Sequence, residues 1–245
     1  GLTPSAVVGH SVGEVAAAWA SGALALAEAV RVIHARSTHQ EVTRHLGGMA
    51  ALLLPADEAR EAIAPFAGLE LAAVNSSRSV TISGPTATLG EFAKAARKRR
   101  WAVKRLDLDY PFHCALVEPI KEPLLASLKD IDPRATTVPL VSTVTGQAVD
   151  GAELTGRYWW DNVRQAVLFA DAVKTLLADH RLFVEIGPRP VLTGYLNDAA
   201  RGAEVKAVVL PSFKQNETPD EPVGDVVRAA VAHGAAVDEA LLFGP

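Results

Sequence analysis

The chain opens with an apolar run, a glycine and an alanine-rich stretch. Residues 6–8 predict a short buried strand that ends in a turn at Gly9. Residues 12–20 consist largely of good helix formers, so they predict a helix directly after the turn. The first structural unit is therefore a strand, a tight turn and a helix.

A second helical stretch covers residues 26–42. Its apolar residues Leu26, Val30 and Ile33 recur at helical spacing, which is typical of one buried helix face. We therefore expect these three side chains to belong to the core.

From Met49 the pattern changes to short segments of β and α type. Strands are predicted at residues 49–54, 69–74, 79–83 and 102–108, and helices at 58–66 and 89–99. The order β-α-β-β-α-β is typical of a ferredoxin-like subdomain.

The rest of the chain alternates between helices and strands. Helices are predicted at residues 118–129 and 170–177, and strands at 139–144, 182–186 and 205–210. Residues 214–222 are polar and rich in proline, which predicts a linker before a last helix at 223–233. The pattern indicates a small domain inserted into a larger α/β domain.

Composition narrows the functional classes. With 49% hydrophobic and 21% charged residues, the chain has the balance of a globular protein with a core. No apolar run approaches the roughly 20 residues that span a bilayer, and there is no signal-peptide pattern, so we expect a cytoplasmic protein without membrane contact. Cys114 is the single cysteine, and no cysteine or histidine cluster has metal-ligand spacing, so we expect no disulfide and no metal. A net charge of -4 argues against nucleic-acid binding.

Residues 9–13 carry the strongest chemical motif. Gly9, Ser11 and Gly13 fit the Gly-x-Ser-x-Gly elbow that presents a nucleophilic serine between a strand and a helix. We expect side chains at positions 9 and 13 to collide with the neighbouring strand and helix. The Val12 N–H and the helix dipole can then stabilise an oxyanion. Ser11 could instead simply cap the helix, but the two glycines and the strand favour the nucleophile.

A serine hydroxyl needs a positioned base, usually histidine. His113 lies in the apolar loop that begins at Tyr110, where a histidine is by default a satisfied, partly buried side chain. Strand alternation should turn His10 away from the reacting face. The remaining histidines lie on or near polar helices and are His34, His39, His45, His180 and His233. The residue pattern alone therefore does not identify which histidine is the base for Ser11.

Several ordered stretches resemble one family. Residues 9–14, Gly-His-Ser-Val-Gly-Glu, are similar to the signature of malonyl-CoA:acyl carrier protein transacylases and of the acyltransferase domains of modular type I polyketide synthases. Further matching positions are Arg36, Asn75 with 80–84, and residues 110–113, 158–165 and 183–192. The residues after 210, including 236–238, resemble the linker that follows such domains. The resemblance covers essentially the whole chain.

The resemblance implies a role for each matching residue. Ser11 would be the nucleophile, His113 its base, and the backbone carbonyl of Gln165 the group that orients the imidazole. The Val12 N–H would line the oxyanion hole, and Arg36 would bind the free carboxylate of the acyl group. The implied substrate-binding set is Arg36, Asn75, His10, Tyr110, Phe112, Gln165 and Val191. Without the resemblance, Arg36 would be a routine helix-surface arginine and Asn75 a turn former.

The implied function is an acyltransferase of polyketide, that is secondary metabolite, biosynthesis. It would move a carboxyacyl unit from coenzyme A, through an ester on Ser11, to the phosphopantetheine thiol of an acyl carrier protein, with neighbouring synthase domains as partners and no bound cofactor. Malonyl is favoured because the Phe112 ring would crowd a methyl branch. Val12 also favours malonyl, since methylmalonyl-selective domains of the family often have glutamine at this position. Tyr110, by contrast, matches the residue of methylmalonyl-selective domains.

The resemblance also implies the boundaries of the subdomains. Residues 1–47 and 109–210 would form an α/β-hydrolase-like large subdomain, 48–108 an inserted ferredoxin-like small subdomain, and 211–245 the linker and helix that follow. The family carries a further N-terminal part with a Gly-Gln-Gly segment, whose glutamine supplies a second oxyanion donor. We expect this chain to lack that part.

Two other functions stay open at this point. A serine esterase or thioesterase of the α/β-hydrolase type shares the elbow, but it normally places its histidine late, after an acidic residue, and has no ferredoxin-like insert. A domain of this kind could also be a non-catalytic docking scaffold for a carrier protein or for neighbouring synthase domains.

Overall fold

The computed structural model describes residues 2–213 and 222–236. The chain divides into two compact units. One unit is Ala6–Thr175, and the other joins Gly1–Ser5 to Leu176–Pro245. The predicted linker at 214–222, except for its last residue, lies outside the described residues, as does most of the stretch 236–238.

The unit Ala6–Thr175 contains a small mixed sheet. Its strands are β1 (Val7–Val8), β6 (Leu140–Val141) and β7 (Ala148–Val149), in the order β1-β6-β7. β1 runs parallel to β6, and β7 runs antiparallel to it. β6 is shorter than the predicted strand 139–144 because the Ser142 hydroxyl accepts hydrogen bonds from the N–H groups of Val144 and Thr145 and turns the chain. The turn leads into β7, which the sequence pattern did not predict.

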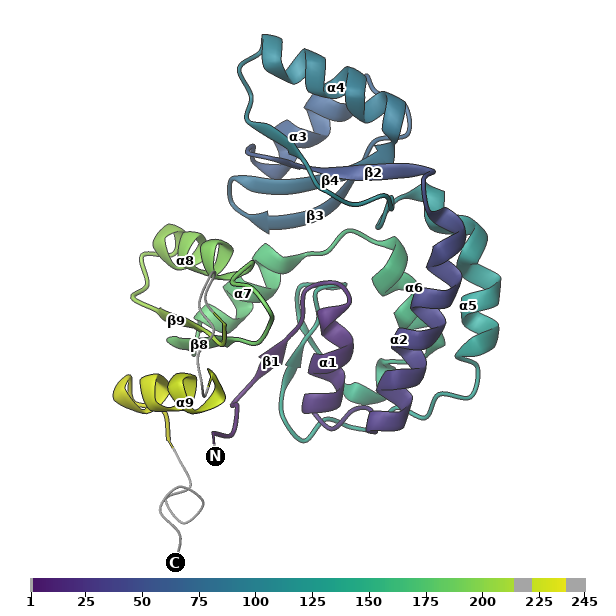
Figure 1. Ribbon diagram of the computed structural model, residues 1–245. Coiled ribbons are helices and arrows are strands. Elements are labelled where there is room, and N and C mark those ends of the chain that lie inside the picture. The colour runs from purple at the N-terminus through teal and green to yellow at the C-terminus, as the bar shows by residue number, and fades with distance from the viewer. Residues whose placement is uncertain (1, 214–221, 237–245) are drawn as a thin grey trace, which may run out of the picture. The chain divides into compact units, whose positions relative to one another are not determined.

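Four helices of this unit pack around one apolar cluster. They are α1 (Gly13–Ala20), α2 (Leu26–Gln40), α5 (Lys121–Ser127) and α6 (Gly156–Arg164). Helix α7 (Phe169–Leu177) follows α6, and its end crosses the unit boundary. Short 3-10 helices are Glu41–Thr43, Ala115–Ile120 and Gly151–Glu153. In Figure 1, α1 lies beside β1. Helix α2 contacts α1 and α5, and α5 also contacts α6. Trp159 and Leu24 are among the largest side chains buried in this cluster.

The predicted buried face of α2 is wrong. Leu26, Val30 and Ile33 are 61%, 57% and 42% exposed. The buried residues of the helix are Ala29, Val32, Ala35, Arg36 and Gln40. Alanines let α1 and α5 pack closely against α2, so the helix buries its alanine-rich face in preference to the three large apolar side chains. This orientation carries Arg36 and Gln40 into the interior.

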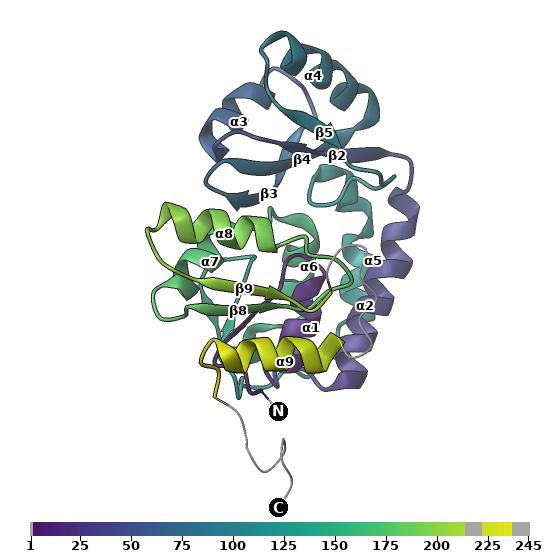
Figure 2. The ribbon, with the colours of Figure 1, turned by 60° about the vertical axis from the view of Figure 1, so that its left-hand side comes forward.

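Residues 47–105 form an antiparallel sheet with two helices. The elements in chain order are β2 (Gly47–Leu52), α3 (Ala56–Ile63), β3 (Glu70–Ser76), β4 (Ser79–Pro85), α4 (Thr86–Lys98) and β5 (Val103–Arg105). The strand order is β3-β4-β2-β5, and each neighbouring pair is antiparallel. Figures 1 and 2 show α3 and α4 on the same face of the sheet, where Phe92 and Leu52 lie in a separate apolar cluster. The β-α-β-β-α-β order predicted from the sequence is confirmed.

The second unit contains a two-stranded parallel sheet. Its strands are β8 (Leu182–Glu185) and β9 (Val208–Pro211), and its helices are α8 (Thr193–Gly202) and α9 (Pro222–Ala232). Figure 2 shows α8 and α9 on opposite sides of the two strands. Neither α8 nor α6 was predicted from the sequence pattern. None of the helices in the described ranges is long and apolar enough to cross a membrane.

Candidate active site

Ser11 lies in the turn between β1 and α1. Its φ is 54°, a left-handed conformation that non-glycine residues seldom adopt. The predicted steric role of Gly9 is confirmed, because a Cβ at this position would lie 2.3 Å from both the Cα and the N of Glu14. The same prediction for Gly13 is wrong, since a Cβ there meets nothing within 4 Å. Gly13 already starts α1, so its side-chain direction points clear of its neighbours.

His113 reaches Ser11 from the loop that follows β5. Its Nε2 lies 2.7 Å from the Ser11 Oγ, and its Nδ1 lies 2.9 Å from the backbone oxygen of Gln165. The carbonyl can only accept, so Nδ1 carries the proton and Nε2 is free to accept the serine proton. His113 has a φ of 60°, a region in which histidine and asparagine are enriched among non-glycine residues. The geometry is that of a serine paired with a base.

The environment keeps the His113 imidazole neutral. Burial lowers the pKa of His113 from 6.5 to about 3, and the positive charge of Arg36 acts in the same direction. The Gln165 hydrogen bond raises the pKa and offsets part of this shift. A lowered histidine pKa means that the ring is uncharged at every pH well above 3, and an uncharged ring can accept a proton.

Arg36 projects from α2 to the same hydroxyl. Its Nη2 donates to the Ser11 Oγ at 3.1 Å, and its Nη1 donates to the Asn162 Oδ1 at 2.5 Å. The side chain is buried, and burial lowers the pKa of Arg36 to about 10, so it stays charged at neutral pH. The alternative of a routine surface arginine does not hold, because the structure places a buried cation beside the serine.

A polar network under the turn was not recognised in the sequence. Glu14 is fully buried and accepts hydrogen bonds from the Tyr158 hydroxyl, from the Thr143 N–H at 3.2 Å and from the Asn162 Nδ2 at 2.8 Å. Burial raises the pKa of Glu14, and the hydrogen bonds from Tyr158 and Thr143 lower it. The Asn162 Nδ2 also lies 3.3 Å from the Ser11 carbonyl oxygen. Asn162 thus connects the carboxyl, the serine backbone and the Arg36 guanidinium.

The available sequence signals for this network were weak. Glu14 precedes Ala18 by one helical turn on the buried face of α1, and Asn162 lies between Trp159 and Val163 on the buried face of α6. A polar residue on an apolar helix face is a reason to look for buried hydrogen bonds. Only the fold shows which residues they contact.

His10 and Asn75 form a pair beside the site. The His10 Nε2 lies 2.8 Å from the Asn75 Oδ1, and the Asn75 Nδ2 donates to the Thr81 hydroxyl at 3.0 Å. Burial lowers the pKa of His10, whose charge in turn influences the pKa of His113. The expectation that His10 points away is therefore wrong, because the turn changes the chain direction and ends the alternation of a strand.

The other predicted site residues have different surroundings. Val12 is 49% exposed, and among the described residues no hydrogen bond from its backbone N–H is found. The Tyr110 hydroxyl donates to Glu41 at 2.7 Å, and the Tyr110 and Phe112 rings stack with centroids 5.3 Å apart. Val191 belongs to the second unit and is 64% exposed. The structure thus brings Ser11, His113, Arg36 and the Gln165 carbonyl together, while the roles of Val191, Tyr110 and Phe112 stay predictions.

The Cys114 thiol is buried and donates to the Pro111 carbonyl at 3.3 Å, and burial raises its pKa, so it is a poor nucleophile. No group of three or more candidate metal ligands occurs within residues 2–213 and 222–236.

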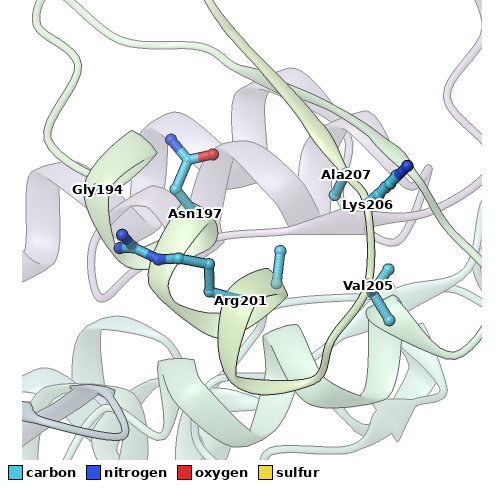
Figure 3. A pocket seen from close by; sticks show the side chains of 7 residues that line it. Gly194, Asn197, Arg201, Val205, Lys206 and Ala207 are labelled. Atoms are coloured by element: carbon cyan, nitrogen blue, oxygen red, sulfur yellow. The ribbon is translucent and has the colours of Figure 1, made fainter.

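The second unit has an open hollow next to α8 (Figure 3). It is lined by Gly194, Asn197, Ala200, Arg201, Val205, Lys206 and Ala207. Arg201 lies 3.5 Å from Asp198 in an ion pair, so part of its charge is balanced. None of the predicted site residues lines this hollow.

The site around Ser11 has the parts needed for acyl transfer through a serine ester. It has a hydroxyl, a neutral base at 2.7 Å, a backbone N–H at a helix start and a buried cation. Within the part of the chain that the structure describes, no carboxylate is hydrogen-bonded to His113, and its Nδ1 partner is the Gln165 carbonyl oxygen. The arrangement is therefore a Ser-His dyad and differs from a Ser-His-Asp triad.

The chain is similar to known proteins in sequence and in fold. Residues 1–238 match the family described as acyl transferase domain. The chain is 41% identical to a spectinabilin polyketide synthase system protein of Streptomyces orinoci over 89% of its length, and 39% identical to an erythronolide synthase of Saccharopolyspora erythraea over 97%. It matches the acyltransferase domain from module 8 of the salinomycin polyketide synthase with a TM-score of 0.92 and 37% identity over 96% of the chain.

The match covers different shares of these relatives. The chain spans 6% and 7% of the two synthases and 56% of the solved salinomycin domain. The family model covers nearly the whole of the present chain, and the relatives named above are synthase proteins and a synthase domain. The chain therefore belongs to the acyltransferase domain family of modular type I polyketide synthases.

Proposed function

We propose that the chain transfers a carboxyacyl unit, with malonyl favoured, from coenzyme A through an ester on Ser11 to the phosphopantetheine thiol of an acyl carrier protein. The observation that carries this proposal is that one hydroxyl, the Ser11 Oγ, is within hydrogen-bonding distance of both a neutral imidazole and a buried guanidinium. The first group activates the serine, and the second can recognise a carboxylate on the acyl group.

The first half-reaction makes the ester. His113 Nε2 takes the Ser11 proton as the Oγ attacks the thioester carbon, and the Val12 N–H stabilises the oxyanion of the tetrahedral intermediate. The C–S bond then breaks, and the coenzyme A sulfur takes the proton from the imidazolium. In the second half-reaction His113 accepts the proton of the carrier thiol, and the thiolate attacks the ester carbon. The bond between this carbon and the Ser11 Oγ then breaks, and the proton returns to the Ser11 oxygen. Atoms and charge balance over the cycle.

Arg36 distinguishes carboxyacyl from simple acyl groups. A carboxylate that enters the site replaces the Ser11 Oγ on the guanidinium and forms a charge-assisted pair in a buried environment. An acetyl group offers no such partner. The bound carboxylate also fixes the far end of the ester, which leaves water less room to hydrolyse it.

The choice of malonyl rests on the loop before His113. The Phe112 ring is held by stacking on Tyr110, whose hydroxyl bonds to Glu41, so we expect Phe112 to keep its position when the substrate binds. A fixed ring beside the α-carbon would disfavour a methyl branch. One methyl group gives only about 1 to 3 kcal/mol of discrimination, so we expect a preference of about ten- to a hundredfold.

We also propose the architecture and partners of the family for this chain. Residues 48–108 act as a ferredoxin-like small subdomain, and the elements before and after them as an α/β-hydrolase-like large subdomain. The acyl carrier protein and the neighbouring synthase domains are the expected partners, as the presence of matching domains within much longer synthases supports.

A time course separates this function from its two rivals. The intact protein is incubated with malonyl-CoA, and the masses of the Ser11 peptide and of free malonate are followed. We expect a malonyl ester on Ser11 that persists until a carrier protein thiol is added. Rapid release of malonate without the ester would indicate a hydrolase, and the absence of both products would indicate a docking scaffold.

Replacing Arg36 by Ala is expected to lower the preference for malonyl-CoA over acetyl-CoA by at least about a hundredfold, because the carboxylate loses a buried charge partner. The measurement is the ratio of the two esters on Ser11 in an equimolar mixture. Arg31→Ala is the matched control, since Arg31 lies on the same helix and donates to the Ser127 carbonyl at the surface. An unchanged ratio in Arg36→Ala would remove Arg36 from the binding site.

The rate of acylation is expected to be nearly independent of pH between about 5 and 7. The His113 pKa is lowered to about 3, so the base stays neutral as the pH falls through this range. A histidine with a pKa of 6.5 would instead lose about thirtyfold in its neutral fraction by pH 5. The measurement is kcat/KM for malonyl-CoA against pH, and a limb of unit slope near pH 6.5 would contradict the assignment.

A further inference from the structure

The guanidinium of Arg36 has an edge that is occupied by neutral acceptors. Its Nε donates to the Gln40 Oε1 at 3.3 Å, and its Nη2 donates to the Ser11 Oγ at 3.1 Å. These two N–H groups point in parallel and form one of the edges that can bind a carboxylate with two hydrogen bonds. The Nη1 group points elsewhere and is held by Asn162. A carboxylate that binds this edge must therefore replace Ser11 and Gln40 as acceptors.

The side-chain amide of Gln40 makes hydrogen bonds to the described residues only through its oxygen. Gln40 is 6% exposed at the last position of α2, and its Nε2 is buried without a hydrogen-bond partner among the described residues. Only one other buried side-chain nitrogen or oxygen, the Trp159 Nε1, has this property within the described ranges. Buried polar groups in proteins almost always have a partner, so an unsatisfied amide beside the candidate carboxylate site needs an explanation.

The present orientation of the amide follows from the charge of Arg36. Two N–H donors cannot face each other, so the Gln40 oxygen points to the guanidinium and the Nε2 is left over. A carboxylate between the two side chains reverses this preference, because it can accept from both. Rotation of the amide about its last torsion exchanges the oxygen and the nitrogen without moving the rest of the side chain.

We propose that Gln40 is a substrate-binding residue whose amide turns when the acyl group carries a carboxylate. The Gln40 Nε2 then donates to one carboxylate oxygen, and the Arg36 Nε and Nη2 donate to the same group. The unsatisfied donor of the empty site becomes satisfied only with a carboxyacyl substrate, so Gln40 adds to the discrimination against simple acyl groups. This inference rests on the proposed function of Arg36.

Two nearly isosteric variants test this role of Gln40. Gln40→Met removes the donor and the acceptor, and Gln40→Glu keeps an acceptor for the Arg36 Nε but has no donor. The intact protein receives an equimolar mixture of malonyl-CoA and acetyl-CoA, and the ratio of the two esters on Ser11 is measured by mass spectrometry. We expect the malonyl preference to fall about tenfold in Gln40→Met, because one hydrogen bond to a charged group is lost.

Gln40→Glu gives the sharper result. We expect its malonyl preference to fall by at least about a hundredfold, because the new carboxylate pairs with Arg36 and repels the substrate. A malonyl preference that stays at the wild-type level in Gln40→Glu would overturn the inference, because it would show that residue 40 does not face the bound carboxylate. Ser37→Ala, an exposed change on the same helix, is the matched control, and circular dichroism verifies that each variant is folded.

The ratio of malonyl to acetyl ester in the wild type distinguishes a failure of the Gln40 proposal from a failure of the Arg36 proposal. A wild-type preference for malonyl that survives both Gln40 variants would overturn the role of Gln40 and leave Arg36 in place. Equal loading of malonyl and acetyl groups by the wild type would overturn the function of Arg36, and the role of Gln40 with it.

Discussion

Replacing His113 by Asn is expected to slow the acylation of Ser11 by at least about a thousandfold. The imidazole Nε2 is the neutral acceptor at 2.7 Å from the Oγ, and an amide cannot take the serine proton. Asn is preferred to Ala here because residue 113 has a φ of 60°, which Asn tolerates well. The measurement is the rate of ester formation on Ser11 after mixing with malonyl-CoA, followed by mass spectrometry.

His39→Asn serves as the matched control for this variant. His39 lies on α2, and its Nε2 is 2.9 Å from the Ser127 hydroxyl, so we expect the rate to stay within about twofold of the wild type. If His113→Asn kept about a tenth or more of the wild-type rate, a different base would have to activate Ser11.

Replacing Gly9 by Ala is expected to lower the free energy of unfolding by about 3 kcal/mol or more. The added Cβ would lie 2.3 Å from two backbone atoms of Glu14, and backbone cannot move aside as a flexible side chain can. The shift would also disturb the turn that holds Ser11 at a φ of 54°. Urea unfolding followed by tryptophan fluorescence measures the change, because Trp159 and Trp160 are buried in the same apolar cluster as Val15 of α1.

Gly13→Ala provides the contrast within the same motif. Its Cβ would meet nothing within 4 Å, and it lies at the start of a helix, so we expect a gain of up to about 1 kcal/mol. An equal loss of stability in both variants would show that the two glycines are needed for the same reason, which the structure contradicts.

Local pattern was enough for the elements whose neighbours in the chain are also neighbours in space. The antiparallel sheet of residues 47–105 contains one such pair, β3 with β4, and the order of its strands and helices along the chain was predicted. The face of α2 was not, because the pattern of Leu26, Val30 and Ile33 gives no information about which helices pack against it. Burial of an alanine-rich face depends on the close approach of α1 and α5.

The site shows the same division between local and long-range information. The elbow at Ser11 was recognised from residues 9–13 alone. His113 was only one histidine among seven until the family resemblance singled it out, because its contact with Ser11 joins residues 102 positions apart. The contact of Glu14 with Asn162 spans 148 positions, and neither residue belonged to the predicted site. Their hydrogen bonds depend on how α1 and α6 are packed, which periodicity does not specify.

The most direct test of the assignment is a crystal structure of the malonyl ester on Ser11. We expect the ester carbonyl oxygen at the Val12 N–H and the free carboxylate about 2.8 Å from the Arg36 guanidinium, where it replaces the hydrogen bond that the Ser11 Oγ accepts now. A carboxylate that points to solvent, with Arg36 still bound only to Asn162 and Gln40, would contradict the recognition of a carboxyacyl group by this site.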